Sequence, residues 1–592
     1  MTDIILFIFA FGILLFGLIL LKKKDTPIPL VQDVLCCFLT ELSIGAIAAK
    51  VYAICSVPVG LRSMGIAYLI LGAFIWFFII KFRSIQKFKF ELWDIYSILI
   101  ITIWFAIVFI SIFTFNIENK YINSDPAMHL KLALDLMDSG KISPMHFGEL
   151  FNGLILSIFE PFLSRLSLYK IYILLDAFAS LINVYVFWML ICTFCKHKCV
   201  KVVLPFLGMG YFAGWPLFNF ILGGFGYVVW GVTLFALIVY LLIKFYESEE
   251  KKNQLILIFA IGINCIGLAF CYMLFLPALG LIILLVLIEQ GKKIDWHFNI
   301  KKLSLISFGI LGMGSLVFII CFRGYFNGNV QYFLDILKME GWTHKDLYRD
   351  FIFLLPPFLY MGWQYIKKRR FNIIFVSTLS IFAFVCFTFV LCLCNLMSSY
   401  YFYKTYCLLW FFMWIMLVDA MEYLLDKDKG IVVAYAVSFG LPFVMTITGA
   451  DYALENKEVV VDEKDSRLYP SFYPILDGYA YYLNEENNCL EDKEGIRDIS
   501  GYIFNNFTEK TEIPLIACDG RWGYWYYCFT NNDSIYVANG DELLSALCEY
   551  EKAGYEYVVI HQNSETYRKV KEKLAEYEKK YDNGYYGIYC IK

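Results

Sequence analysis

The chain has 592 residues, of which 60% are hydrophobic and only 17% are charged. This share of charged residues is well below that of an ordinary globular protein, so the composition indicates a membrane protein. The formal net charge is −3 and no block of basic residues is large enough to hold nucleic acid, which excludes that class of partner.

Apolar runs of about 20 residues predict a polytopic α-helical bundle of about fourteen spans. The first run ends in three lysines without a small-residue cleavage site, so we expect a retained span and not a signal peptide. Two spans meet at Cys271-Tyr272, and the span 202–222 is broken by Gly214-Trp215-Pro216. The predicted spans lie near residues 3–21, 30–56, 64–81, 93–115, 168–195, 202–222, 227–245, 254–271, 272–289, 303–322, 351–366, 372–394, 404–423 and 430–449.

Basic residues fall in every second connection between these spans, and the positive-inside rule makes those seven connections cytoplasmic. The N-terminus and the C-terminal tail are then extracytoplasmic in a multi-pass cell-membrane protein. The other predicted outer connections are 57–63, 116–167, 223–226, 324–350 and 395–403. The basic residues are Lys22 to Lys24, Lys81/Arg83/Lys87/Lys89, Lys196/Lys198/Lys201, Lys244/Lys251/Lys252, Lys292/Lys293/Lys301/Lys302, Lys367 to Arg370 and Lys427/Lys429.

The second predicted span contains two charged residues, Glu41 and Lys50. A charge inside a span is costly and usually faces a cavity or a partner. Lys50 lies near the outer end of its span, where its side chain could also snorkel to the membrane surface.

The long outer connection 116–167 begins with the polar stretch Asn123-Ser124-Asp125-Pro126-Ala127-Met128-His129. Asp before Pro is typical of a helix start, because Asp can cap the free backbone amides and Pro fits the first helical position. Asp125 and His129 then lie one turn apart on one face, an arrangement suited to acid–base chemistry. The structural alternative is ordinary capping by Asp125, with His129 a plain surface residue.

Two helices at the membrane surface are predicted in the same connection. Residues 126–138 carry an apolar stripe with charges elsewhere, as in a helix lying on a membrane, and the helix is expected to end at Ser139-Gly140-Lys141. Residues 151–162 are apolar but too short to span. We therefore expect the connection to form a roof over the bundle, with Asp125 at its edge.

Asp176 is placed in the outer half of the next span, either as part of a site or as a hydrogen-bonded residue between two helices.

The run Gly223-Gly224-Phe225-Gly226 predicts a tight turn; it lacks the following soluble helix that a phosphate-binding loop requires. The later outer connection 324–350, with Arg323 at its start and Lys338 within it, is predicted to be either a loop that closes over a substrate or a solvated link.

The outer stretch Ser398-Ser399-Tyr400-Tyr401-Phe402-Tyr403-Lys404-Thr405-Tyr406 contains one charge in a long apolar region. A lysine at the outer membrane boundary can meet a lipid phosphate, and hydroxyls such as those of Tyr401 and Tyr403 can add hydrogen bonds. The alternative for Lys404 is snorkelling to ordinary headgroups.

Residues 1–449 form the predicted transmembrane bundle and residues 450–592 a soluble extracytoplasmic α/β domain. Short apolar runs at 513–518, 535–538, 557–560 and 585–591 predict strands, and 493–507, 540–553 and 564–581 predict helices. Alternation of the two types favours a small α/β sheet. The domain carries no catalytic motif that we can identify, and its five cysteines allow at most two disulfides and imply none. We interpret it as a recognition or scaffolding unit.

These features resemble the GT-C superfamily of integral membrane glycosyltransferases, which take a sugar from a polyprenyl-phosphate carrier. The resemblance rests on the many-span bundle, the large first outer loop with an acidic residue before an interfacial helix, the outer C-terminal domain, and the stretches Ser124 to His129 and Tyr400 to Lys404. Family members commonly show paired acids in that loop, whereas this chain has one Asp with a His one turn on. It also has three extra spans before the loop.

The resemblance implies an inverting transferase that moves a sugar from the lipid-linked donor to a glycan or lipid-linked acceptor. Asp125 would be the general base, His129 would orient it or help hold a divalent ion, and Lys404 with Arg323 would bind the carrier phosphate. No cofactor is certain. The alternatives are a polysaccharide polymerase or ligase, which shares the donor, and a transporter or flippase of lipid-linked saccharides, for which Glu41, Lys50 and Asp176 are candidate intramembrane charges.

Overall fold

The computed structural model describes residues 1–21, 28–82, 88–89, 91–121, 125–142, 149–213, 223–293, 335, 337–339, 354–425, 493–507, 512–517, 520–532, 535–537 and 539–592. Arg323 and the predicted spans 303–322 and 430–449 lie outside these residues, as does the proposed domain boundary near 450.

Within the described residues, nine helical segments are long and apolar enough to cross a membrane, which confirms the multi-pass prediction. A shorter helix, α8 (Lys198–Ala213), occupies the first part of the predicted span 202–222, and α15 (Leu355–Lys367) most of the predicted span 351–366. The membrane-length helices are α1 (Thr2–Leu21), α2 (Leu30–Ile54), α3 (Leu61–Phe82), α4 (Leu92–Phe113), α7 (Arg165–Cys192), α9 (Gly226–Glu247), α10 (Lys251–Tyr272) with α11 (Leu276–Lys293), α16 (Ile373–Leu393) and α17 (Ser399–Leu425).

The long apolar segment Asn253–Gly291 is interrupted where the sequence predicted a boundary between two spans. It has 39 residues and contains a 3-10 turn, Met273–Phe275, between α10 and α11. A continuous helix of that length would measure about 58 Å, nearly twice the thickness of the hydrocarbon core. We therefore count α10 and α11 as two spans.

The centre of the bundle is formed by α9 and α17, which are buried along almost their whole length. Helix α7 packs against α9, and α10 lies between α9 and α2. At the edge, α1 and α3 pack mainly on each other, and the outward side of α4 exposes Leu92, Ile95 and Leu99. An apolar face of this kind is expected where a helix meets lipid.

Two helices cover one end of the bundle, as the sequence predicted. Helix α5 (Asp125–Ser139) begins at Asp125 and ends before Gly140, whose φ of +65° favours glycine. Helix α6 (Leu150–Phe159) is too short to span and packs against α5. Gly153 of α6 allows this close contact, because a Cβ there would lie 2.8 Å from the Ala133 carbonyl oxygen.

The C-terminal residues form a five-stranded sheet flanked by helices, which confirms the predicted α/β unit. The strand order is β4-β3-β5-β7-β6, with β3 parallel to β4 and β5 and the other pairs antiparallel. Helix α21 begins with a capping box between Asn539 and Glu542. The elements are β3 (Leu515–Ala517), α20 (Gly520–Thr530), β4 (Ile535–Val537), α21 (Gly540–Lys552), β5 (Tyr557–His561), α22 (Glu565–Leu574), β6 (Glu578–Asp582) and β7 (Tyr586–Cys590).

Two details of this unit were predicted wrongly. The expected helix 564–581 ends at Leu574, and residues 578–582 form strand β6 because they pair with the otherwise open edge of β7. Helix α20 was not predicted, since its Tyr- and Trp-rich sequence has no clear helical period. The described cysteines of this unit, Cys528, Cys548 and Cys590, are free thiols.

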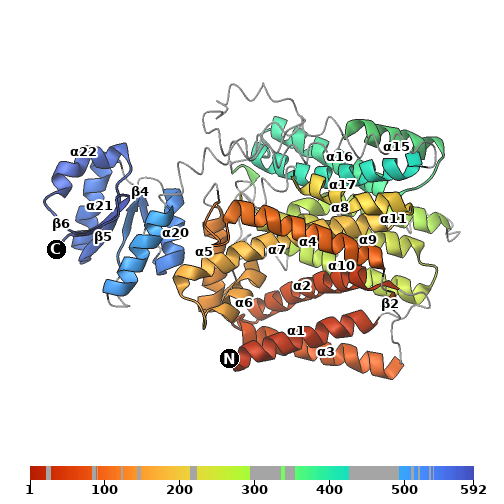
Figure 1. Ribbon diagram of the computed structural model, residues 1–592, viewed down its shortest axis with the longest axis horizontal. Coiled ribbons are helices and arrows are strands. Elements are labelled where there is room, and N and C mark those ends of the chain that lie inside the picture. Colours follow the sequence, from red (N-terminus) through yellow and green to blue (C-terminus); the bar gives the residue numbers. More distant parts are fainter. Residues whose placement is uncertain are drawn as a thin grey trace.

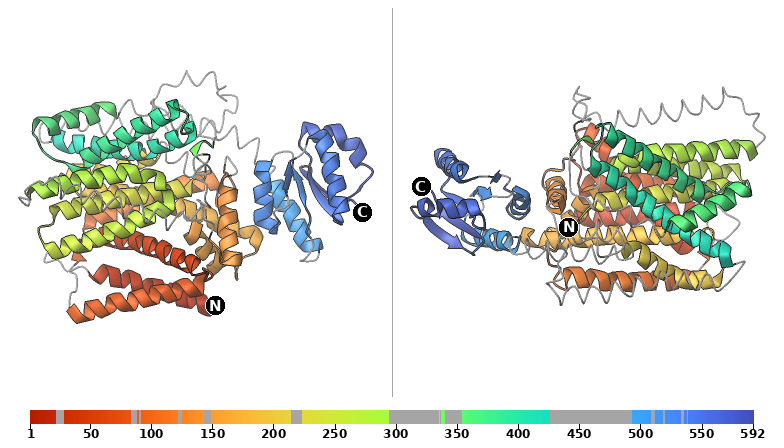
Figure 2. Two further views of the ribbon diagram at one scale, coloured as in Figure 1. Left: turned by 180° about the vertical axis from the view of Figure 1, so that it is seen from behind. Right: turned by 90° about the horizontal axis from the view of Figure 1, so that it is seen from above.

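The C-terminal unit lies beyond one end of the bundle and meets it where α20 packs on α5 (Figure 1). The thiol of Cys528 donates to the Ala127 carbonyl oxygen at 3.2 Å, and the Tyr527 hydroxyl donates to the Asp135 carboxylate. Figure 2 shows the same arrangement from two further directions, with the N-terminus at the end of the bundle that carries the C-terminal unit. The N-terminus and the C-terminal unit thus lie at the same end of the bundle.

The orientation of that side can be tested with single cysteines in a cysteine-depleted background. We expect Glu565→Cys, on the C-terminal unit, to react with a membrane-impermeant maleimide in whole cells. Glu249→Cys, exposed between α9 and α10, should react only after the membrane is permeabilised. Both labelling rates would be read by gel shift, and the reverse pattern would overturn the extracytoplasmic assignment.

Candidate functional site

The start of α5 is held in place by the glycine-rich connection before α9. Gly224 has φ +69°, and a Cβ on it would lie 2.1 Å from the Pro126 side chain. Only glycine permits both this backbone conformation and this contact. The run Gly223 to Gly226 is therefore a turn, as predicted, and it also brings the first turn of α5 against the first turn of α9.

Lys404 of α17 is buried in this region, with 4% of its surface exposed. Its ammonium group donates hydrogen bonds to the hydroxyls of Tyr227 on α9 and Tyr400 on α17. It also lies 3.8 Å from the ring centroid of Tyr400 and 4.8 Å from those of Tyr227 and Phe225. Aromatic rings and hydroxyls thus replace water around a buried cation.

Asp125 lies within electrostatic range of this cation. It interacts with Lys404, with His129 and with the hydroxyls of Tyr227 and Tyr400. The fold therefore brings together two residues that the sequence singled out separately, one from the roof and one from a span. We call Asp125, His129, Tyr227, Tyr400 and Lys404 the outer cluster.

His129 is buried and connects the outer cluster to a second carboxyl group. Its Nδ1 lies 3.1 Å from Oε1 of Glu149, just before α6, and its ring centroid lies 4.6 Å from that of Tyr227. The other oxygen of Glu149 accepts a hydrogen bond from the Asn152 amide at 2.8 Å. The imidazole is therefore fixed in orientation between α6 and α9.

Burial disfavours the charged form of both partners. It lowers the pKa of His129 to about 4, with the Lys404 cation adding to the effect and Asp125 opposing it. It raises the pKa of Glu149 to about 8, opposed by the hydrogen bond from Asn152. At neutral pH the pair is then a neutral imidazole beside a protonated carboxyl.

Asp176 is buried in the outer half of α7, next to the outer cluster. It accepts a hydrogen bond of 2.9 Å from the Tyr121 hydroxyl, and a Cβ on Gly226 would lie 2.3 Å from its Oδ1. The backbone carbonyl of Tyr121 accepts at 2.5 Å from Lys493, which belongs to the first described helix of the C-terminal tail. Asp176 therefore links α7 to α9, and Tyr121 links it to the tail.

The other predicted site residues divide into three groups. Tyr401 lies at the margin, with its ring centroid 6.0 Å from the Lys404 ammonium. Tyr403 packs against Phe402 and Tyr406, on a different side of α17 from the ring contacts of Lys404. Arg323 lies outside the described residues. The roles of all these residues, including Asp125 and His129, remain predictions.

Three members of the site were missed by sequence reasoning. Tyr400 lies four residues before Lys404, a spacing that places both on one face of a helix and could have identified it. Tyr227 is one aromatic residue among many at a predicted membrane boundary. Glu149 lies far along the outer loop from His129, and no local pattern connects them.

The donor set of the outer cluster does not fit a divalent metal. Asp125 is its only carboxylate, Nδ1 of His129 already faces Glu149, and the Lys404 cation would repel a second cation. Elsewhere in the described parts of the chain, no group of three or more His, Cys, Asp or Glu side chains is placed to hold a metal ion. We derive no step through a metal.

Comparison with known proteins gives similarity in structure only. No family model matches the sequence, and no curated protein matches it. The crystal structure of ArnT from Cupriavidus metallidurans in the apo state aligns with 83% of this chain and 98% of that one, at 12% identity and a TM-score of 0.49. The structure of the same protein bound to undecaprenyl phosphate covers the same shares at 13% identity and a TM-score of 0.47.

At such TM-scores and identities the likeness concerns the arrangement of the helices and carries no information on activity.

The contact between α7 and α9 predicts a strict requirement for glycine at position 226. We expect Gly226→Ala to lower the free energy of unfolding by about 1–3 kcal/mol, because the added methyl group overlaps the Asp176 carboxylate. Gly262→Ala in α10 is the matched control, since a Cβ there meets open space. Thermal unfolding in one detergent compares them, and equal stability of the two variants would contradict the described contact.

The pKa of Glu149 predicts a pH dependence of stability. Between pH 6.5 and 8 the folded protein keeps a proton on Glu149 that the unfolded chain has lost, so this contribution is lost as pH rises through 8. His129 of the unfolded chain titrates near pH 6.5, at the lower edge of this window, so it adds an opposing slope there that the parent and the variant share. Glu149→Gln should therefore remove a slope of at most about 1.4 kcal/mol per pH unit.

The measurement is the unfolding midpoint at pH 6.5, 7.25 and 8 for the parent and for Glu149→Gln. Glu512→Gln, at an exposed position, is the control. Identical slopes for the parent and Glu149→Gln would show that Glu149 does not hold its proton in this range.

Proposed function

We propose that the protein is a membrane glycosyltransferase that transfers a sugar from a polyprenyl-phosphate donor to a cell-envelope acceptor on the outer face. The observation that carries the proposal is the outer cluster, in which a carboxylate and a buried ammonium group meet at the roofed end of the bundle. A donor of this kind needs a base for the acceptor and a cation for the departing phosphate. The cluster contains both, near the first turns of the membrane-length helices α9 and α17.

Lys404 is the proposed phosphate-binding group. Two of its three N–H donors have hydroxyl partners among the described residues, which leaves one for a phosphate oxygen. The hydroxyls of Tyr227 and Tyr400 lie 3.4 Å apart, so one can donate to the other while the second keeps its hydrogen for a ligand. Lys404 and one of these tyrosines can therefore both donate to one phosphate.

Asp125 is the proposed general base. The acceptor hydroxyl would attack the anomeric carbon while Asp125 takes its proton, and the bond from that carbon to the phosphate oxygen would break with its electrons going to the phosphate. The departing phosphate gains negative charge, which Lys404 stabilises. Attack from the side opposite to the leaving group inverts the anomeric centre.

His129 and Glu149 are proposed to position the base. A neutral imidazole can donate one hydrogen bond and adds no positive charge beside Lys404. The hydrogen bonds from Lys493 to Tyr121 and from Tyr121 to Asp176 fix the neighbouring helices, and the C-terminal unit holds α5 through α20. This supports a scaffolding role for the C-terminal unit.

The alternative functions use the chain differently. A polysaccharide polymerase or ligase would use the same donor and differ in the acceptor. A transporter would need a path of charges through the membrane, but Asp176 is held by Tyr121 at the outer end and Glu41 lies near Tyr68 of α3. The described residues therefore favour a stationary catalytic site over a transport path through the membrane.

The first test is sugar transfer in isolated membranes with a panel of radiolabelled polyprenyl-phosphate sugars and envelope acceptors, starting with undecaprenyl carriers. We expect Asp125→Asn to lower the rate of transfer at saturating donor by about 100-fold or more, because a general base is lost. Asp138→Asn on the same helix removes only a partly exposed ion pair with Arg165 and should retain nearly full activity. Full transfer by Asp125→Asn would show that Asp125 is a helix cap and not the general base.

The second test separates phosphate binding from catalysis. Lys404→Ala should raise the KM for the donor by about 10- to 100-fold, since a charge-assisted hydrogen bond is lost. Lys338→Ala is the control, because Lys338 is an exposed lysine on a segment that bonds to Ser398 through its backbone. Equal changes in KM for both variants would contradict the role of Lys404.

A further inference from the structure

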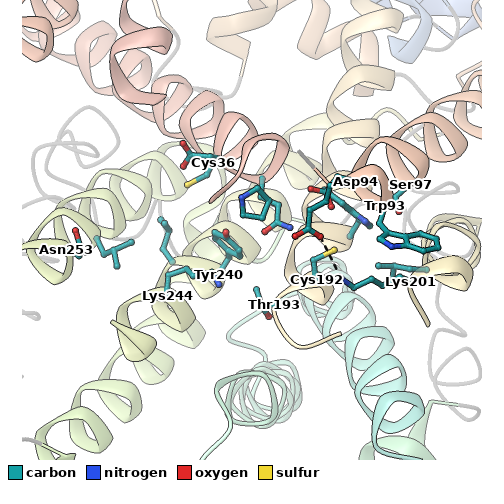
Figure 3. Close-up of a pocket in the computed structure, with 18 of the residues that line it drawn as sticks. Cys36, Trp93, Asp94, Ser97, Cys192, Thr193, Lys201, Tyr240, Lys244 and Asn253 are labelled. Carbon is teal, nitrogen blue, oxygen red and sulfur yellow. Dashed lines mark ion pairs between the residues drawn. The ribbon is translucent and has the colours of Figure 1, made fainter. Parts of the chain in front are cut away.

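A cavity lies at the end of the bundle opposite the outer cluster. It has a volume of about 300 Å³ and is bounded by the first turns of α2 and α4, the ends of α7 and α9, and parts of α8 and α10. In Figure 3, Trp93, Asp94 and Ser97 of α4 lie on one side and Tyr240 and Lys244 of α9 on the other. This is the end that the charge pattern assigns to the cytoplasm.

Two buried carboxylates line the cavity. Asp33 of α2 is 2% exposed and Asp94 of α4 is 4% exposed. The strands β1 (Ile28–Pro29) and β2 (Phe88–Lys89) pair in parallel just before these helices, which brings the two helix starts side by side. A carboxylate in the first turn is favoured by the helix dipole, so each acid has a structural reason to lie there. Their convergence on one cavity is a property of the fold.

The rim carries the opposite charge. Lys201 and Lys244 line the cavity with about a quarter of each side chain exposed, 26% and 29%. Glu91 lies 3.9 Å from Lys201 and Glu247 lies 3.3 Å from Lys244, so a ligand phosphate would take the place of these partly exposed carboxylates beside the lysines. The buried acids disfavour an anionic ligand, and the lysines at the rim disfavour a metal cation. A zwitterion whose cationic group points into the cavity matches both sets of charges.

The residues around the cavity are of the kind that contact lipid. Leu92 is 83% exposed on α4, next to Trp93 at the cavity, so this part of the wall meets the membrane. Trp188, Leu204 and Leu241 supply apolar lining. The volume lies at the lower end of ligand pockets, which suits a headgroup better than a sugar-lipid.

We propose that this cavity binds the headgroup of an aminophospholipid from the inner leaflet, with the primary ammonium beside Asp33 and Asp94 and the phosphate beside Lys201 and Lys244. The site is separate from the outer cluster and does not depend on the function proposed for it. Bound lipid would join the starts of α2 and α4 to the ends of α7 and α9.

The test uses the full-length protein in nanodiscs of phosphatidylcholine with a minor fraction of phosphatidylethanolamine. After exchange, the lipid that stays with the protein is quantified by mass spectrometry. We expect phosphatidylethanolamine to be enriched about tenfold over its bulk share, as one charge-assisted hydrogen bond can supply. The variant Asp33→Asn/Asp94→Asn should lose this enrichment, and Glu249→Gln, an exposed acid at the same end, should keep it.

A second measurement on the parent protein alone covers the case in which the double variant does not fold. Stepwise N-methylation of the added phosphatidylethanolamine should weaken retention at each step, because each methyl group removes an N–H donor. Displacement of the lipid by soluble phosphoethanolamine would assign the same chemistry to a soluble zwitterion and overturn the lipid source. Equal retention of phosphatidylethanolamine and phosphatidylcholine by the parent would overturn the site itself.

Discussion

The structure depends on the burial of one ammonium group, that of Lys404, at the outer end of the central helix α17. A charge removed from water is tolerated only where other groups replace its hydration, and here two tyrosine hydroxyls, three aromatic rings at 3.8 to 4.8 Å and a nearby carboxylate do so. These groups come from α5, α9, α17 and the connection before α9. The groups that surround this one cation therefore also fix the position of α5 on the bundle. Gly224 leaves space for Pro126 at the start of α5, and Gly226 leaves space for the Asp176 carboxylate.

The contacts around Lys404 have a structural interpretation, in which they only stabilise the fold, and a functional one, in which they bind the donor phosphate. These two interpretations differ in what they require of the outer cluster. A purely structural ion pair is often neutral or unfavourable compared with apolar packing, so it gives a weak reason for a lysine at this depth. A donor that carries a phosphate on a lipid gives a stronger reason, because the group to be bound carries the opposite charge. Lys404 also keeps one N–H donor without a partner among the described residues, which a fully satisfied structural pair would not.

The sequence predicted the parts of this protein that arise from local patterns. Apolar runs gave the spans, and the break between α10 and α11 falls at the predicted boundary. Asp125-Pro126 predicted the start of α5, and Gly140 predicted its end. Contacts between distant segments could not be predicted in this way: Glu149 meets His129 only because α6 folds onto α5, and β6 forms only because β7 offers an open edge. Tyr403 was chosen as a neighbour of Lys404 in sequence, whereas the helical period selects Tyr400, four residues away.

The central claim is that Asp125 and Lys404 act as one unit in sugar transfer, and a double-mutant cycle tests it most directly. The rate of transfer from one polyprenyl-phosphate sugar at subsaturating donor would be measured for the parent, Asp125→Asn, Lys404→Met and the double variant. The account predicts strong non-additivity, with the double variant losing little more than Asp125→Asn alone, because each residue is useful only while the other is in place. Losses that simply multiply would contradict it, because they would show that the base and the phosphate-binding group contribute independently.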